Sequence, residues 1–271
     1  MNDDPGVALW LCPKKHTELY EKLETVMASL QTLFPGTPPS FEPHVTISTN
    51  IDIALDDPEK RHDDVDRILG ASVAALQSIP ATSTNSPLVR LGRVGTQRSK
   101  YKKLYFEVAP DANLLSFAQI IRELFVVLPQ LVERENQLIN PHLYTADNHG
   151  NRIRRAKLRS SKRASSTSEK DSVPTKQISL QPLQNEASSV AAQWSKSEFF
   201  PHLSMVYSEV YPIGSAMWRT ITTRIQDYLG IDNCDDPVVE DTGLGWNGGV
   251  LKLVLCRGDP QDWIELGSVD V

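Results

Sequence analysis

The chain has 271 residues, of which 40% are hydrophobic and 23% are charged, proportions typical of an ordinary soluble globular protein. This length allows one large core or two small ones. The formal net charge of -6 argues against a protein that coats long nucleic acid through a broad basic face, although it permits a local pocket for a small anionic ligand.

The helical segments alternate with predicted strands along most of the chain. Apolar spacing of three and four residues predicts helices, and Asp111 is the expected N-cap of the third. Short apolar or alternating runs predict the strands, of which 88–97 and 102–110 form a hairpin. The helices are expected at 14–34, 56–79, 111–128 and 215–229, and the strands at 6–12, 44–49, 88–97, 102–110, 199–208, 248–258 and 263–271.

Residues 147–197 interrupt this order. They begin with the basic stretch "RIRRAKLRSSKR" and continue into Ser/Gln/Pro-rich sequence without clear apolar periodicity. We therefore expect a disordered basic and Ser-rich insertion. A nuclear-import patch, a regulatory loop with phosphorylation sites and an RNA-docking arm are alternative interpretations.

The N-terminal segment and the cysteines constrain the compartment. Residues 1–15 open with acidic residues and a short apolar run, which predicts neither a signal peptide nor a transit peptide. No apolar run in the sequence approaches membrane-spanning length, so no membrane insertion is expected. Cys12, Cys234 and Cys256 are scattered and have no metal-ligand spacing, which predicts free thiols in a reducing compartment.

Two stretches far apart share one pattern, "FEPHVTISTN" at 41–50 and "FFPHLSMVYS" at 199–208. Each has a histidine after a proline and a hydroxyl residue two positions later. Residues i and i+2 of a strand lie on the same face, so His44 and Thr46 share a face, as do His202 and Ser204. The repeated pattern indicates internal duplication. The predicted fold is α+β, a single bilobal domain with one motif per lobe and two antiparallel sheets facing a central groove.

The other histidines fit this pattern less well. His142 also follows a proline in "NPHLYT", but Thr145 is three positions later and would lie on the opposite face of a strand. His16, His62 and His149 lie at a helix start, among acidic residues and at the edge of the insertion.

Two facing imidazoles suit in-line phosphoryl chemistry. One removes a proton from water while the other donates a proton to the leaving oxygen. The hydroxyls of Thr46 and Ser204 can donate hydrogen bonds to the phosphoryl oxygens. The sequence has no P-loop, G-x-S-x-G elbow, dinucleotide fingerprint or metal-ligand cluster, so no cofactor and no metal are expected.

The paired motifs resemble those of the two-histidine phosphoesterase superfamily, whose signature is two H-x-[ST] motifs on opposed sheets. More narrowly, the chain is similar to the cyclic phosphodiesterases of fungi and plants, through "ALWLCP", "EPHVT", "RVGT", "FFPHLSMVYSEV" and "LKLVLCRGD". The resemblance covers about 1–145 and 198–271, and the insertion departs from the compact members.

The resemblance implies a bilobal fold with pseudo-two-fold symmetry. It also implies hydrolysis of ADP-ribose 1″,2″-cyclic phosphate, a by-product of tRNA splicing, to ADP-ribose 1″-phosphate, and of nucleoside 2′,3′-cyclic phosphates to 2′-phosphates. Carried over by position, His44, Thr46, His202 and Ser204 are the catalytic residues, and the same resemblance assigns Trp10, Tyr207 and Thr96 to substrate binding.

Two other functions remain open at this point. One is RNA-end processing or 2′–5′ RNA ligation, and the other is a non-catalytic nucleotide-binding module. The expected partner is a small cyclic-phosphate nucleotide, without a stable long nucleic-acid partner, and the expected state is a monomer. The expected localisation is cytoplasmic, with Golgi association as an alternative implied by the resemblance.

Overall fold

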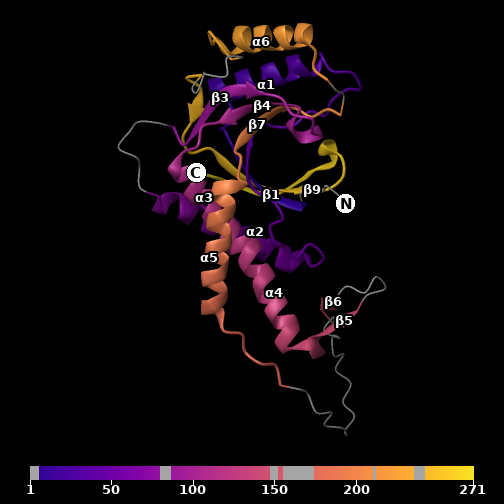
Figure 1. Ribbon diagram of the computed structural model, residues 1–271, viewed down its shortest axis with the longest axis vertical. Coiled ribbons are helices and arrows are strands. Elements are labelled where there is room, and N and C mark those ends of the chain that lie inside the picture. Colours follow the sequence, from indigo (N-terminus) through magenta and orange to yellow (C-terminus); the bar gives the residue numbers. More distant parts are fainter. Residues whose placement is uncertain (1–5, 80–86, 147–151, 155–173, 210–211, 235–241) are drawn as a thin grey trace.

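The computed structural model describes residues 6–79, 87–146, 152–154, 174–209, 212–234 and 242–271 (Figure 1). Eight antiparallel strands form one curled sheet in the order β10-β9-β1-β2-β7-β4-β3-β8. The strands are β1 (Gly6–Cys12), β2 (Val45–Ser48), β3 (Val89–Gly95), β4 (Leu104–Val108), β7 (His202–Val206), β8 (Gly245–Trp246), β9 (Val250–Cys256) and β10 (Ile264–Asp270).

The two motif strands, β2 and β7, are neighbours at the middle of this sheet. They pair through a single register position, Val45 opposite Leu203, so four strands lie on each side of the junction. The sequence predicted an α+β fold with antiparallel strands, and that part is confirmed. The two halves belong to one continuous curled sheet, however, because the β2–β7 pair joins them; two separate sheets were expected.

Four helices cover the sheet, two on each half. On the β7 side, α1 (Glu18–Gln31) packs against β7 and against α6 (Ser215–Leu229). On the β2 side, α2 (Pro58–Ser78) packs against β9 and β10, and α3 (Ala112–Arg122) packs against β2. Figure 1 shows α1 and α6 at one end of the sheet and α2 and α3 at the other.

The helix-covered face of the sheet is apolar at the junction. Val45 and Leu203 are fully buried and belong to one core that also contains residues of α1, α2, α3 and α6. Because side chains alternate along a strand, packing Val45 and Leu203 into this core turns the residues on either side of them to the other face. The core therefore positions both histidine–hydroxyl pairs.

The third predicted helix is confirmed at its start and is longer than expected. Asp111 caps it by accepting hydrogen bonds from the backbone N–H groups of Asn113 and Leu114. The helix then continues through a π-helical segment, Glu123–Val127, into α4 (Leu128–Ile139). Pro129, in the first turn of α4, lacks an N–H, and in a regular α-helix its ring would clash with the preceding turn. The wider π-helical segment directly precedes it.

This continuous helix has a property that the sequence analysis did not anticipate. Ala112–Ile139 is long and apolar enough, by length and composition, to cross a membrane, and it is the single such helix in the described part of the chain. Its apolar side faces the core, where Leu114, Phe117 and Ile121 are fully buried. This packing is that of a core helix.

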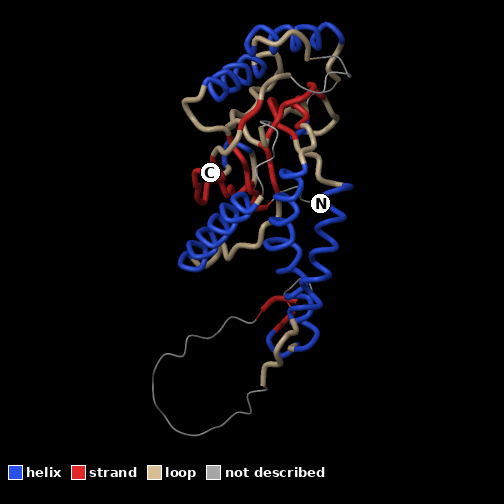
Figure 2. Tube along the Cα trace, turned by 90° about the vertical axis from the view of Figure 1, so that its left-hand side faces the viewer, coloured by secondary structure: helices blue, strands red, loops and turns tan. Residues whose placement is uncertain are grey.

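Residues 180–197 also differ from the expectation of a disordered insertion. They form α5 (Leu180–Ser197), which runs beside α3 and α4 (Figure 2). Its buried residues recur every fourth position, at Leu183, Ala187, Ala191 and Ser195. This stripe consists mostly of small residues, so it lacked the strong apolar periodicity that predicts an amphipathic helix. Such residues let the helices approach closely.

A small second sheet lies at the far end of α4. It pairs β5 (Tyr144–Ala146) with β6 (Arg152–Arg154), so the beginning of the predicted insertion also contains a strand. Residues 155–173, which include most of the basic and Ser-rich stretch, lie outside the described residues.

Candidate active site

A cavity of about 180 Å³ lies where β2 meets β7. All four motif side chains line it: His44 and Thr46 from the β2 segment, and His202 and Ser204 from β7. The i, i+2 geometry predicted from the sequence therefore places both pairs at one cavity. In an antiparallel pair centred on Val45 and Leu203, each histidine lies opposite the hydroxyl residue of the other motif.

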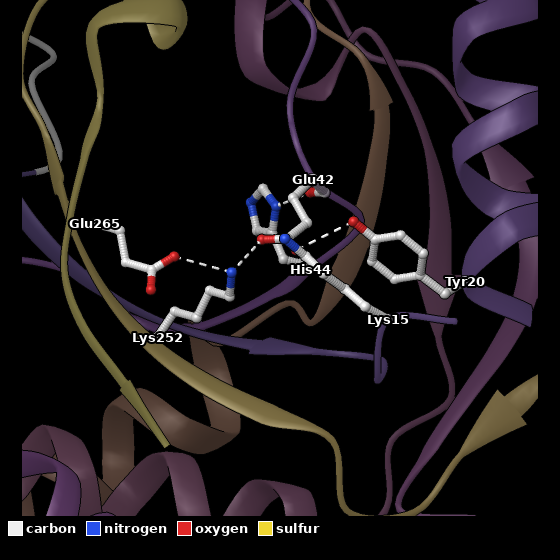
Figure 3. Close-up of polar contacts among 6 residues, drawn as sticks. All are labelled: Lys15, Tyr20, Glu42, His44, Lys252 and Glu265. Carbon is white, nitrogen blue, oxygen red and sulfur yellow. Dashed lines mark hydrogen bonds and ion pairs between the residues drawn. The ribbon is translucent and has the colours of Figure 1, made fainter. Parts of the chain in front are cut away.

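His44 is buried and held in one orientation. Its Nδ1–H donates a hydrogen bond of 2.6 Å to the backbone carbonyl oxygen of Glu42, shown in Figure 3. A carbonyl can only accept, so Nδ1 carries the proton and Nε2 of the neutral ring is the unprotonated nitrogen. The ring also stacks on Trp10, with centroids 3.7 Å apart and planes 9° from parallel.

His202 has the same hydrogen bond in the other half. Its Nδ1 donates to the carbonyl oxygen of Phe200, also two residues earlier, at 2.8 Å. The ring stacks on Phe200 and lies edge-on to Tyr105, with a distance of 5.5 Å between the His202 and Tyr105 ring centroids. The repeat therefore extends beyond the motif to the backbone carbonyl that selects the tautomer.

Burial lowers the pKa of both histidines. For His44 the pKa falls to about 4, mainly through burial, although the hydrogen bond to Glu42 opposes the shift. For His202 it also falls to about 4, again mainly through burial, with the hydrogen bond to Phe200 opposing and Lys102 adding to the decrease. Without a bound anion, both imidazoles are thus neutral at neutral pH and each can accept a proton.

The two hydroxyl residues differ in their partners. The Ser204 hydroxyl donates a 2.8 Å hydrogen bond to the carbonyl oxygen of Tyr101, and it is also hydrogen-bonded with the hydroxyl of Tyr207. Thr46 has no hydrogen-bond partner among the described residues for its side chain. The Thr46 hydroxyl is therefore available to a ligand, whereas Ser204 must first give up a contact within the protein.

Aromatic side chains form much of the cavity wall. Trp10 and Tyr207, both predicted from the resemblance, line it. Tyr101 and Trp263 complete this wall and were missed, because they come from the β3–β4 connection and from the segment before β10. Trp263 lies 5.8 to 6.0 Å from Trp10, Tyr101 and Tyr207, measured between ring centroids.

Lys102 supplies the cation of this cavity. It ends a short 3-10 turn, Lys100–Lys102, and its ammonium group lies 5.1 Å from the centroid of the Phe200 ring. Burial lowers the pKa of Lys102. The run "KYKK" was visible in the sequence, but only its place in the loop beside β7 shows which lysine reaches the cavity.

Thr96 and His142 lie outside the cavity lining. The Thr96 hydroxyl donates to the carbonyl oxygen of Lys103 at 2.6 Å, which fastens the two ends of the β3–β4 connection. His142 lies in the 3-10 turn Pro141–Leu143 at the end of α4 and is absent from the cavity lining. Among the described residues, no group of three or more histidine, cysteine, aspartate and glutamate side chains has a metal-binding arrangement.

Comparison with known proteins identifies close relatives of this chain. A family model described as "Cyclic phosphodiesterase-like protein" matches residues 5–271. The chain is 55% identical to a protein of Debaryomyces hansenii named 2′,3′-cyclic-nucleotide 3′-phosphodiesterase, over 91% of this chain and 99% of that protein. Proteins of the same name from Candida albicans and Saccharomyces cerevisiae are 53% and 28% identical, each over 98% of this chain and at least 99% of the relative.

Proposed function

The chain belongs to the cyclic phosphodiesterase-like family, and from this premise we propose that it is a 2′,3′-cyclic-nucleotide 3′-phosphodiesterase acting through His44 and His202. The single observation that carries the mechanism is the pair of imidazoles on adjacent strands at one cavity, each with Nδ1–H donated to a backbone carbonyl. Hydrolysis of a cyclic phosphate needs a proton acceptor and a proton donor on opposite sides of phosphorus, and this pair can supply both.

In the proposed reaction, the unprotonated Nε2 of one histidine takes a proton from water as the water oxygen bonds to phosphorus. The bond from phosphorus to the ribose 3′ oxygen breaks, and the second histidine, protonated when substrate binds, gives its proton to that oxygen. The product is the 2′-phosphate. Each proton is accounted for, and the enzyme needs one neutral and one charged imidazole in the bound complex.

Substrate binding itself can produce the charged imidazole. The pKa of each histidine is lowered to about 4 mainly by burial, and a phosphodiester anion in the cavity favours the protonated ring. Lys102 and the Thr46 hydroxyl lie where they can stabilise the negative phosphoryl oxygens. The aromatic wall provides apolar surface against which a ribose or base can lie.

We include ADP-ribose 1″,2″-cyclic phosphate among the proposed substrates, with ADP-ribose 1″-phosphate as product. Both substrate classes carry a five-membered cyclic phosphate on a ribose, and this is the group that the cavity of about 180 Å³ would bind. This shared part is the one on which the reaction takes place.

The test is hydrolysis of adenosine 2′,3′-cyclic phosphate and of ADP-ribose 1″,2″-cyclic phosphate in the presence of EDTA, followed by phosphorus NMR. We expect the 2′-phosphate alone from the nucleotide and full activity with chelator. A mixture of 2′- and 3′-phosphates, or activity that requires an added divalent metal, would contradict the two-histidine mechanism. A third arm with short RNA carrying 2′,3′-cyclic phosphate ends distinguishes RNA-end processing.

A further inference from the structure

A cluster of charged side chains lies beside His44 (Figure 3). Its lysine, Lys252, pairs in register with Trp10, so it lies on the same face of the sheet as that cavity residue. Lys252 of β9 is its centre: its ammonium nitrogen lies 2.6 Å from Oε2 of Glu42 and 2.9 Å from Oε2 of Glu265. Lys15 and Tyr20 contact the other oxygen of Glu42, at 3.3 and 3.1 Å. Glu42 is thus held from three directions.

Glu42 matters because its backbone holds His44. Its carbonyl oxygen accepts the Nδ1–H of His44, the contact that leaves Nε2 unprotonated in the neutral ring. Glu42 precedes β2 and belongs to no helix or strand. Among the described residues, Phe41, Glu42 and Pro43 make no hydrogen bond from backbone to backbone. The position of this carbonyl therefore depends on side-chain contacts.

The other half of the sheet holds the equivalent carbonyl differently. Phe200 supplies it, and the next residue, Pro201, accepts a backbone hydrogen bond of 3.1 Å from Val108 at the end of β4. Glu107 then pairs in register with His202. Backbone pairing with β4 thus fixes the segment before His202, whereas the segment before His44 lacks such a bond.

Lys252 is suited to the role of an anchor. It is 7% exposed, and a buried ammonium group is stable only with partners that satisfy its charge. Despite its burial, the hydrogen bonds to Glu42 and Glu265 raise the pKa of Lys252. Burial likewise opposes ionisation of Glu42, yet its contact with Lys252 lowers the pKa of that carboxyl. Both partners of the ion pair are therefore charged at neutral pH.

We propose that Lys252 is a positioning residue that, through its ion pair with Glu42, holds the Glu42 carbonyl against Nδ1 of His44 and so fixes the ring orientation and tautomer needed for catalysis. Lys252 does not line the cavity, so this role does not require contact with substrate. The inference rests on the proposed function of His44. It predicts that loss of Lys252 affects the chemical step more than substrate binding.

The principal experiment compares Lys252→Met with Lys14→Met. Lys14 forms an exposed ion pair with Asp270 and contacts neither Glu42 nor His44, so its substitution is the matched control. A displaced general acid or base slows chemistry steeply, so we expect Lys252→Met to lower kcat by about 10- to 100-fold with KM within about threefold of wild type. Lys14→Met should match wild type, and Lys252→Arg should recover part of the loss because it keeps the charge.

The second readout is the tautomer of His44, followed by long-range proton–nitrogen NMR on protein with labelled histidine. His44→Ala identifies the signals. Wild type should show Nδ1 protonated, and Lys252→Met should show both neutral tautomers in exchange. If Lys252→Met does not fold, Tyr20→Phe removes one donor to Glu42 without leaving a buried charge, and we expect a change in the same direction of about threefold in kcat.

Two outcomes would overturn the proposal. One is an unchanged His44 tautomer in folded Lys252→Met, whatever its activity. The other is a raised KM with unchanged kcat, which would show that the charge acts in substrate binding. The tautomer measurement needs no turnover, so it remains informative if His44→Ala keeps full activity and the proposed function fails.

Discussion

The half of the sheet that carries His44 and the half that carries His202 present the same functional groups in different surroundings. In both, a histidine donates Nδ1–H to the carbonyl two residues earlier, and an aromatic residue from the neighbouring strand contacts the ring. On one side this residue is Trp10, which pairs with Thr46, and on the other it is Tyr105, which pairs with Ser204. The repeat thus extends to β1 and β4.

The differences lie in what supports each copy. His44 has a stacked tryptophan and a preceding loop held by the ion pair of Glu42 with buried Lys252. His202 has edge-on Tyr105 and a segment held by backbone pairing. The hydroxyls also differ, since Ser204 bonds to the Tyr101 carbonyl. The two motifs therefore present the same side chains to the cavity, whereas the contacts that hold each histidine in place differ.

The largest expected effect tests whether the two halves are equivalent in chemistry. His44→Ala and His202→Ala should each lower kcat by about 10²- to 10⁴-fold, because each removes a positioned general acid or base. His142→Ala is the control and should stay near wild type. Steady-state kinetics on a cyclic nucleotide, with circular dichroism to verify folding, provide the measurement. Activity near wild type in either motif variant would show that the halves are unequal.

The next effect concerns helix α5 in the His44 half. Helix α5 packs on α3, and α3 packs on β2, just as α6 packs on α1 and α1 on β7 in the other half. Ala187 is fully buried, so Ala187→Asp should lower the free energy of unfolding by roughly 3 kcal/mol, while exposed Ser189→Asp should change it little.

Urea unfolding of Ala187→Asp and Ser189→Asp measures this difference. Equal stability of the two variants would mean that α5 contributes no packing energy. The same packing bears on the expected disordered insertion: deletion of 149–195 removes most of α5 and should destabilise the protein, because Leu183, Ala187 and Ala191 leave the buried interface.

The two hydroxyl residues should differ in how much activity their loss costs. Thr46→Ala should cost about 2–3 kcal/mol of transition-state stabilisation, the usual value of one lost donor to a phosphoryl or similar oxygen. Ser204→Ala should cost roughly 1 kcal/mol, because its hydroxyl already donates to Tyr101 and a hydrogen bond is exchanged. The ratio of kcat/KM between each variant and wild type measures these two costs. A larger loss for Ser204→Ala would indicate that substrate binding turns this hydroxyl toward phosphate.

The smallest effect is a shift in pH dependence shared by both halves. A mechanism that needs one neutral and one charged histidine gives a bell-shaped pH profile. Burial lowers the pKa of His44 and His202 to about 4, so both limbs of kcat/KM, which report the free enzyme, should lie below pH 6.5. Bound phosphodiester favours the imidazolium form, so the kcat profile should lie about one pH unit higher.

Rates measured from pH 4 to pH 9 at low and saturating substrate separate the two profiles. Coincident profiles with an optimum near pH 7 would show that burial does not depress these pKa values in solution. A monotonic profile would contradict the requirement for one neutral and one charged histidine.

Much of the fold and half of the site could be predicted from local sequence. The strands at 6–12 and 102–110 and the Asp111 cap depend on patterns of a few residues, and the structure has them. The shared face of His44 and Thr46 follows from the two-residue period of any strand, and so does that of His202 and Ser204. The sequence therefore predicted that the histidine and the hydroxyl residue of each motif lie on one face.

Only the tertiary structure decided how the copies meet. The β2–β7 contact joins residues about 160 positions apart, through one pair at Val45 and Leu203, and no local pattern encodes which strands become neighbours. Tyr101, Lys102 and Trp263 reach the cavity from connections whose path depends on packing. The lowered pKa values of the histidines arise from burial, which exists only after both halves close on one core.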